Sequence, residues 1–178
     1  MEKLICVYGA ASDTVENHYI LATEALGEAL AKAGWSLIYG GGGTGMMGAA
    51  ARGMTRGGGR VIGVLPEFMT GYESLYPYCD ETVVTETMSE RKQIMEDRAE
   101  AFIIAPGGVG TMDEFFQVLT LKTLDRHAKP IVLYNIGGFY DQQIAFIDKG
   151  IQEGFISPAC RSAFAVCDTP AAVLAALG

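Results

Sequence analysis

The chain has 178 residues, the size of one ordinary domain, so we expect a single domain over residues 1–178. Its formal net charge of -8 and its isoelectric point near 4.7 disfavour nucleic acid as a partner, because polyanions bind clustered positive charge. A mean hydropathy of +0.22 with only 19% charged residues is high for a soluble monomer and favours a homodimer.

The cysteines and the apolar runs indicate the cellular compartment of the protein. Its four cysteines are scattered without a C-x-x-C pair, and only two histidines accompany them, so a zinc site is not expected and the thiols fit a reducing cytoplasm. The apolar run at residues 4–8 is too short for a signal peptide, and no stretch of 18 apolar residues predicts a membrane span. We expect a cytoplasmic protein that uses no metal or cofactor.

Apolar runs and helical periodicity alternate along the chain. Strands are predicted at residues 4–8, 35–39, 60–65, 81–85, 101–105, 129–134 and 164–167. Residues 67–78 are predicted as a loop, and helices are predicted at residues 14–33, from the glycine run 40–45 to 56, and at 87–99, 113–124, 140–150 and 170–177. This alternation predicts an α/β protein with a Rossmann-like, doubly wound parallel sheet that has helices on both faces.

Three of the predicted strands end in turns of small residues. These turns follow Tyr8, Tyr39 and Ala105. In parallel α/β sheets the carboxyl ends of the strands lie at one edge, and ligands bind in the crevice beyond them. The three turns are therefore expected to face one binding crevice.

The second turn carries a weak dinucleotide pattern. Residues 43–48 (GTGMMG) match G-x-G-x-x-G, and Glu67 follows at about the distance of a ribose-binding acid. The match follows the second strand rather than the first, however, and a chain with 23 glycines produces it easily. Three interpretations remain open: NAD(P) binding, close packing of helix on sheet, and a phosphate or ribose wall of a mononucleotide site. The last makes Gly42 and Gly45 candidate substrate-binding residues.

The third turn is the most informative stretch of the chain. Residues 106–114 (PGGVGTMDE) lie between an apolar strand and a helix, so glycine backbone and a helix N-terminus meet where an anion can bind. A structural alternative is a capping box, in which Thr111 caps the helix and Glu114 reaches back. That alternative leaves the glycines of the turn unexplained. We therefore expect a nucleotide site in which Glu114 acts on the nucleotide.

The helix predicted at residues 87–99 places a cation among apolar side chains. Met88, Arg91 and Met95 are three or four residues apart and so share one face. A buried guanidinium needs an anion, for which the candidates are a ligand phosphate and Glu114; alternatively, the arginine reaches solvent at the edge of the apolar face. Lys92 adds a second positive charge one step around the helix.

The helix predicted at residues 113–124 is apolar on nearly all sides. Its apolar residues are Phe115, Phe116, Val118, Leu119, Leu121 and Leu124. Such a helix is either central in the fold or covered by another subunit. We expect it to form a homodimer interface close to the nucleotide site.

Together these residues resemble a known family. Residues 106–114 fit the P-G-G-x-G-T-x-x-E signature of the Lonely Guy proteins, the cytokinin riboside 5'-monophosphate phosphoribohydrolases, which are often labelled possible lysine decarboxylases. The resemblance covers nearly the whole chain, through residues 39–42, 45–48, 57–64, 88–92, 146–148 and 153–156. The combination is far more specific than any single glycine motif.

The resemblance implies hydrolysis, without a metal, of the N-glycosidic bond of AMP, N6-modified AMP or a related nucleoside monophosphate to a free base and ribose 5-phosphate. By position, Arg91 and Glu114 match the catalytic pair of the family. Glu67 is a further candidate for substrate binding beside the positions that match, which are Lys92, Gly107, Gly108, Val109, Gly110, Thr111, Asp113 and Thr120. The segment 67–86 departs from the family pattern, so the preferred base is not predicted.

The implied reaction builds positive charge on the ribose as the C–N bond breaks, and a carboxylate can stabilise that charge while it orients or deprotonates the attacking water. We assign this role to Glu114, and to Arg91 the binding of phosphate or ribose oxygens. The alternative function is a non-catalytic carrier of a nucleotide or of molybdenum cofactor, whose carriers have a related fold. Amino-acid decarboxylation is disfavoured because no lysine lies in a recognisable pyridoxal phosphate context.

Overall fold

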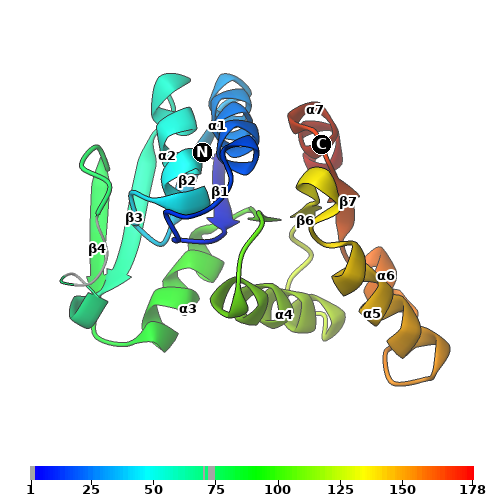
Figure 1. Ribbon diagram of the computed structural model, residues 1–178. Helices are drawn as coiled ribbons and strands as arrows, with labels where there is room; N and C mark the ends of the chain where they lie inside the picture. Colours follow the sequence, from blue (N-terminus) through cyan, green and yellow to red (C-terminus); the bar gives the residue numbers. More distant parts are fainter. Residues whose placement is uncertain (1–2, 70, 72–74) are drawn as a thin grey trace.

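The computed structural model describes residues 3–69, 71 and 75–178. These residues form a seven-stranded sheet in the order β4-β3-β2-β1-β5-β6-β7 (Figure 1). All neighbouring strands run parallel, which confirms the predicted doubly wound sheet. The strands are β1 (Lys3–Tyr8), β2 (Trp35–Tyr39), β3 (Val61–Pro66), β4 (Glu81–Thr85), β5 (Ala101–Ile104), β6 (Ile131–Tyr134) and β7 (Ala165–Cys167).

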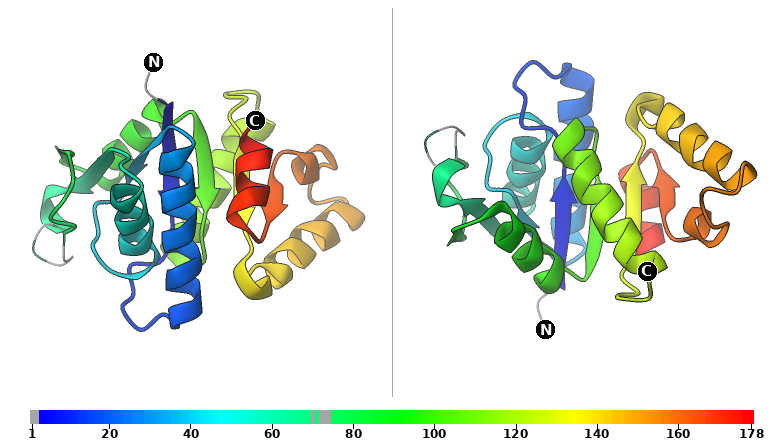
Figure 2. Two further views of the ribbon diagram at one scale, coloured as in Figure 1. Left: turned by 90° about the horizontal axis from the view of Figure 1, so that it is seen from above. Right: turned by 90° about the horizontal axis from the view of Figure 1, so that it is seen from below.

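Helices cover both faces of the sheet (Figures 1 and 2). One face carries α1 (Asn17–Lys32), α2 (Gly45–Arg56) and α7 (Pro170–Leu177). The other face carries α3 (Met88–Arg98), α4 (Val109–Thr123), α5 (Asp141–Gln152) and α6 (Ala159–Ser162). Two short 3-10 turns, η1 (Glu67–Met69) and η2 (Ile136–Gly138), follow β3 and β6. Within the described ranges, no helix combines the length and apolar character needed to cross a bilayer.

The first strand shows how the sheet divides the core into two layers. Ile5 and Val7 pack with the helices of the first face, whereas Cys6 and Tyr8 pack with those of the second. This follows from the strand geometry, since successive side chains point to opposite faces. Because helices cover both faces, the central strands are buried along nearly their whole length and are mostly apolar, rather than alternating with polar residues.

The elements differ from the prediction mainly around the third glycine turn. Helix α4 begins at Val109, four residues before the predicted start at Asp113, with Gly108 as its N-cap. Glycine and β-branched residues have low helix propensity, so residues 109–111 read as a turn in sequence. Helix α6 and η2 were not predicted because both are too short for periodicity to show. Within the predicted loop 67–78, residues 70 and 72–74 lie outside the described residues.

The winding of the sheet reverses between β1 and β5, the two central strands from which the chain continues in opposite directions. The loops that follow these strands meet beyond the edge of the sheet, where the Ala10 N–H donates to the Pro106 carbonyl at 3.1 Å. This switch point is where α/β sheets of this kind bind ligands, and the first and third glycine turns both lie at it.

Candidate active site

A cavity of about 410 Å³ opens at the switch point. The loop after β1 contributes residues 9–12 to its wall, α2 contributes Met47, and η1 contributes Met69. The predicted catalytic residues Arg91 of α3 and Glu114 of α4 both line it, as do Gly108, Gly110 and Thr111 of the third glycine turn. The structure therefore brings the residues of two distant motifs into one cavity.

Arg91 is fixed in the wall of this cavity by backbone carbonyls. Its side chain is buried, with an exposed fraction of 6% for the residue, and Nε donates to the Val64 carbonyl of β3 at 3.0 Å. Nη2 donates to the Gly40 carbonyl at 3.3 Å, and Nη1 contacts the Met88 sulfur at 3.3 Å. The alternative of an arginine that reaches solvent is therefore wrong. The guanidinium is held by neutral groups, so its charge remains available to an anionic ligand.

The glycine after β2 is required by this arrangement. A Cβ atom on Gly40 would lie 1.9 Å from Nη2 of Arg91. Only a glycine lets the guanidinium approach the end of β2 so closely. Part of the second glycine run thus serves the position of Arg91, a role that its sequence does not reveal.

Glu114 does not belong to a capping box. Because α4 begins at Val109, Thr111 already lies inside the helix and Glu114 lies in its second turn, so the capping-box alternative is wrong. A cap of the expected kind exists instead at α3, where the Thr87 side chain accepts a hydrogen bond from the Glu90 N–H at 3.1 Å. Glu114 is half-buried and faces the cavity that Arg91 also lines.

The N-terminus of α4 presents open hydrogen-bond donors to the cavity. The first intrahelical bond runs from the Met112 N–H to the Gly108 carbonyl at 3.0 Å. In the part of the chain that the structure describes, no backbone carbonyl or side chain accepts a hydrogen bond from the N–H groups of residues 108–111. A Cβ on Gly108 or Gly110 would meet no atom within 4 Å, so packing does not require glycine there. These N–H groups form a site for an anion at the positive end of the helix dipole.

The second glycine turn, by contrast, is closed by the protein itself. The N–H groups of Met46 and Met47 at the start of α2 donate to the Ala10 carbonyl at 2.8 and 3.3 Å. Gly45 has a φ of +59°, and a Cβ there would lie 2.4 Å from the same carbonyl. Gly42 and Gly45 do not line the cavity. Of the three interpretations of the 43–48 pattern, close packing therefore fits this turn. The turn holds the loop after β1 in place.

The remaining residues of the third turn contribute differently. Val109 has an exposed side chain and is not among the residues that line the cavity, so the group it offers to a ligand at the turn is its backbone N–H. Asp113 forms an ion pair with Lys92 of α3, with Nζ and Oδ2 2.9 Å apart. Thr111 is buried beside Gly107, where a Cβ would lie 2.1 Å from the threonine hydroxyl. The turn is thus anchored at both ends and open in the middle.

Thr120 and Glu67, two further predicted substrate-binding residues, also lie outside the lining of this cavity. Thr120 is exposed, and it follows Thr111 by nine residues, or about 13 Å along a helix. Glu67 is exposed in η1, while Met69 of the same turn lines the cavity. Neither residue is among those that line the cavity with Arg91 and Glu114.

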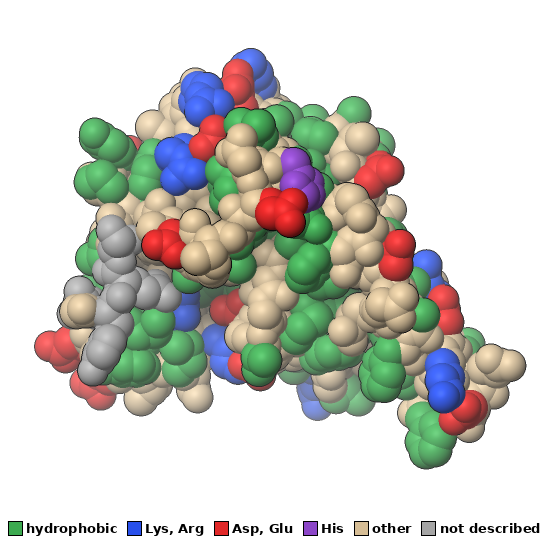
Figure 3. Space-filling model, viewed as in Figure 1, with side chains coloured by type: hydrophobic (Ala, Val, Ile, Leu, Met, Phe, Trp, Pro, Cys, Tyr) green, Lys and Arg blue, Asp and Glu red, His purple; other side chains and the backbone are tan. Residues whose placement is uncertain are grey.

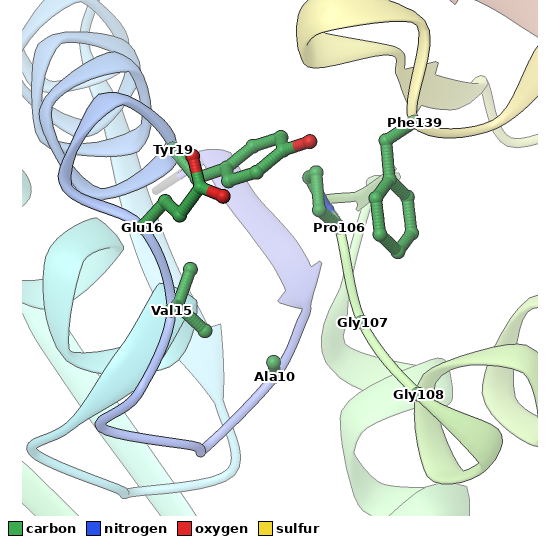
Figure 4. Close-up of a pocket in the computed structure, with 8 residues that line it drawn as sticks. All are labelled: Ala10, Val15, Glu16, Tyr19, Pro106, Gly107, Gly108 and Phe139. Carbon is green, nitrogen blue, oxygen red and sulfur yellow. The ribbon is translucent and has the colours of Figure 1, made fainter.

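Sequence reasoning missed a second cavity, of about 350 Å³, that shares Ala10 and Gly108 with the first. Its lining is largely apolar, and Tyr19 of α1 and Phe139 point toward each other across Pro106 (Figure 4). Their ring centroids are 5.9 Å apart at 80°. Neither aromatic residue lies in a motif, so no sequence signal could have identified this cavity. Among the described residues, no group of three or more His, Cys, Asp or Glu side chains is arranged to hold a metal ion.

Comparison with known sequences identifies relatives over nearly the whole chain. A family model described as possible lysine decarboxylase matches residues 47–177. The cytokinin riboside 5'-monophosphate phosphoribohydrolase of Mycobacterium tuberculosis is 43% identical, over 92% of this chain and 87% of that protein. The enzyme of the same name from Rhodococcoides fascians is 38% identical, over 98% and 89%. A probable enzyme of this name from Oryza sativa subsp. japonica is also 38% identical, over 98% of this chain and 71% of its own length.

Comparison with solved structures identifies the same fold in carrier proteins. The molybdenum cofactor carrier protein of Chlamydomonas reinhardtii superposes with a TM-score of 0.74 at 27% identity, covering 99% of this chain and 96% of that one. The molybdenum cofactor binding protein of Rippkaea orientalis has a TM-score of 0.75 at 20% identity, over 98% and 94%, which shows a common fold alone. The sequence relatives are the more similar, and they show that the chain belongs to the Lonely Guy family of cytokinin riboside 5'-monophosphate phosphoribohydrolases, the family whose model is described as possible lysine decarboxylase.

Proposed function

We propose that the protein hydrolyses the N-glycosidic bond of AMP, of N6-modified AMP or of a related nucleoside monophosphate, and releases the free base and ribose 5-phosphate. The protein is an N-glycosyl hydrolase, a nucleoside 5'-monophosphate phosphoribohydrolase like the relatives named above. The observation that carries this proposal is the single cavity in which Arg91 and Glu114 face the open N–H groups of the third glycine turn.

The 5'-phosphate binds at the N-terminus of α4. Backbone N–H groups of residues 108–111 point to the cavity without a described protein acceptor, and the helix dipole adds positive potential at the same place. The glycines at 108 and 110 leave room for the phosphate oxygens to approach the backbone. Lys92 adds a positive charge next to α4, where Asp113 holds it.

Glu114 then acts at the ribose. It lies four residues after Gly110, one helical turn or about 6 Å further along α4, so a nucleotide bound through its phosphate presents its sugar to this carboxylate. The ionised carboxylate stabilises the positive charge that develops on the ribose and orients the attacking water. Arg91, held by the carbonyls of Val64 and Gly40, binds phosphate or ribose oxygens with its remaining N–H groups.

Incubating the purified protein with a panel of nucleoside monophosphates, and separating the free bases by chromatography, tests this proposal. We expect base release from AMP or N6-substituted AMP. Glu114→Gln is expected to slow the release by about 10²–10⁴-fold without lowering thermal stability, the usual contribution of a positioned acid or base. The matched control is Glu153→Gln, which removes an exposed carboxylate that pairs with Lys149 at the end of α5 and does not line the cavity. Full activity of the Glu114→Gln protein would overturn the assignment.

The alternative function is a carrier, because the molybdenum cofactor carrier of Chlamydomonas reinhardtii shares the fold at 27% identity. A carrier would use the same glycine turn to bind a phosphate but has no need of a carboxylate beside the sugar. Tight nucleotide binding with no base released from any nucleotide of the panel would favour the carrier over the enzyme.

We also propose a cytoplasmic homodimer with neither nucleic acid nor membrane as a partner. Val109 and Leu124, at the two ends of α4, have exposed fractions of 89% and 62%, which leaves an apolar helix without cover on its outer side. All four cysteines are free thiols, as in a reducing compartment. On the face seen in Figure 3, Lys and Arg side chains are interspersed with Asp and Glu rather than gathered in a basic patch. A stable monomer in sedimentation velocity would contradict the dimer.

A further inference from the structure

The tyrosine at the end of β1 has a hydroxyl group that is buried without a hydrogen-bond partner. Tyr8 has an exposed fraction of 2%, and its ring stacks on Phe102 with 6.2 Å between centroids. Its hydroxyl is the one buried side-chain group among the described residues that makes no hydrogen bond of good geometry, and the Cys6 thiol on the same face of the sheet is the polar group beside it. A buried hydroxyl without a hydrogen bond loses the partner that water supplies in the unfolded chain, so a functional reason for its position is expected.

The position of Tyr8 places this hydroxyl behind the proposed active site. Tyr8 directly precedes Gly9, which lines the cavity, and its side chain lies on the face of the sheet that α3 and α4 cover. Phe115, the neighbour of Glu114 on α4, packs in the same apolar cluster as Tyr8. The hydroxyl therefore lies in the layer between the sheet and the helix that carries Glu114.

The surroundings make this hydroxyl a donor rather than a base. Burial raises the pKa of Tyr8 well above its ordinary value, and the nearby Cys6 thiol and Glu114 carboxylate raise the pKa further. Burial likewise raises the pKa of Cys6 far above its ordinary value. Both groups keep their protons at neutral pH, and a neutral phenol that donates a hydrogen bond to a carboxylate stabilises the ionised form of that carboxylate.

We propose that Tyr8 is a positioning residue for Glu114: its hydroxyl donates a hydrogen bond, directly or through one water molecule, to the Glu114 carboxylate and holds it ionised toward the ribose. The long glutamate side chain reaches this position by rotation about its own torsions, and such bonds commonly tighten only when substrate is bound. The effect of Tyr8 on catalysis rests on the proposed function, whereas the hydrogen bond between Tyr8 and Glu114 does not.

A double-mutant cycle in stability tests the contact without any activity. The free energy of unfolding is measured by denaturant titration for the wild type, Tyr8→Phe, Glu114→Ala and the double variant. Phenylalanine keeps the stacking on Phe102 and removes only the hydroxyl. We expect the unfolding equilibrium constant of the double variant to differ from the product of the single effects by about fivefold, as is usual for residues in contact. Additive effects would overturn the proposal.

The kinetic test separates positioning from a merely structural role. For Tyr8→Phe we expect a KM for the nucleotide within about twofold of the wild type and a kcat about tenfold lower, since binding is kept while the carboxylate is less well held. Without the donor the carboxylate takes up a proton more readily, so the acidic limb of the rate profile moves to higher pH. An unchanged kcat and pH profile would contradict a role in the reaction.

Several other ionisable groups lie near Tyr8 and Glu114, and they are the same in the wild type and in Tyr8→Phe. They are Cys6 on β1, Arg91, Lys92 and Glu96 on α3, and Asp113 on α4. Because Tyr8→Phe alters none of them, a shift of the profile is assigned to the hydroxyl.

The matched control is Tyr134→Phe. Tyr134 is equally buried in β6, but its hydroxyl donates to the Ala22 carbonyl at 3.3 Å on the opposite face of the sheet. We expect the effects of Tyr134→Phe and Glu114→Ala on the free energy of unfolding to be additive, and we expect Tyr134→Phe to leave kcat and the pH profile unchanged. If the wild type released no base from any nucleotide, the proposed function would fail, and the stability cycle would still decide whether Tyr8 and Glu114 are coupled.

Discussion

Two glycine turns in this protein have similar sequences and opposite uses. The turn between β2 and α2 and the turn between β5 and α4 both connect a buried strand to a helix at the same edge of the sheet. At the start of α2 the N–H groups of Met46 and Met47 bind the Ala10 carbonyl. At the start of α4 the N–H groups of residues 108–111 bind no described protein acceptor and face the cavity.

The difference between the two turns shows which feature allows the glycine-rich N-terminus of a helix to bind a ligand. Both turns offer unpaired donors and a helix dipole in principle. The loop after β1 decides which turn stays open, because its carbonyl at Ala10 occupies the donors of α2 while its N–H at Ala10 binds the Pro106 carbonyl. Glycine in the closed turn permits contact between two parts of the protein, whereas glycine in the open turn leaves space for a ligand.

The largest expected effect comes from filling the closed turn. Gly45→Ala places a Cβ 2.4 Å from the Ala10 carbonyl and 2.7 Å from the Ser12 carbonyl, at a φ of +59° that a non-glycine residue adopts only with strain. We expect the free energy of unfolding to fall by roughly 3 kcal/mol or more, since strain and a backbone clash add. Denaturant titration measures this loss. A Gly45→Ala protein of wild-type stability would show that the turn is not closed by this contact.

The same substitution in the open turn is expected to affect binding instead. Gly108→Ala places a Cβ where no protein atom lies within 4 Å, at a backbone conformation that alanine accepts. The free energy of unfolding should change by less than about 0.5 kcal/mol. The methyl group enters the space proposed for phosphate, so the dissociation constant for ribose 5-phosphate in calorimetry should rise about tenfold, or about 1.4 kcal/mol. Unchanged affinity would place the phosphate elsewhere.

Much of the fold could be predicted because its signals are local. β2, β4 and α7 have the predicted ends, since short apolar or β-branched runs and a proline at the helix start mark them clearly. The start of α4 was placed four residues late, because residues 109–111 favour a turn locally while the Gly108 cap and the packing of α4 make them helical.

The site could be predicted only where residues carry a motif. Arg91 and Glu114 were identified, but the contacts that hold Arg91 join residues 27 and 51 positions apart in the chain. The capping-box alternative for Thr111 and Glu114 is wrong for the same reason as the predicted helix start. Tyr8 and the cavity beside Tyr19 gave no signal, since a tyrosine in an apolar run indicates core packing and nothing in sequence shows an unpaired hydroxyl.

The smallest expected effect concerns the ion pairs that tie each helix to its neighbour. Lys92 and Asp113 join α3 to α4 beside the open turn, while Arg56 and Glu24 join α2 to α1 beside the closed one. Lys92→Met, Asp113→Asn and the control Arg56→Met should each lower the free energy of unfolding by less than about 1 kcal/mol, because each of the two pairs includes a partly exposed partner. These small losses should shrink further in concentrated salt.

Ligand affinity then distinguishes the two kinds of pair. If Lys92 binds the nucleotide, Lys92→Met should weaken ribose 5-phosphate binding about fivefold, since one partly exposed ionic contact contributes about 1 kcal/mol. Asp113→Asn leaves the lysine in place and removes a negative charge near the phosphate, so affinity should stay equal or increase. Arg56→Met lies away from the cavity and should leave the affinity for ribose 5-phosphate unchanged. Equal weakening by Lys92→Met and Asp113→Asn would instead give the pair one role, that of holding α4 against α3 so that the open turn keeps its shape.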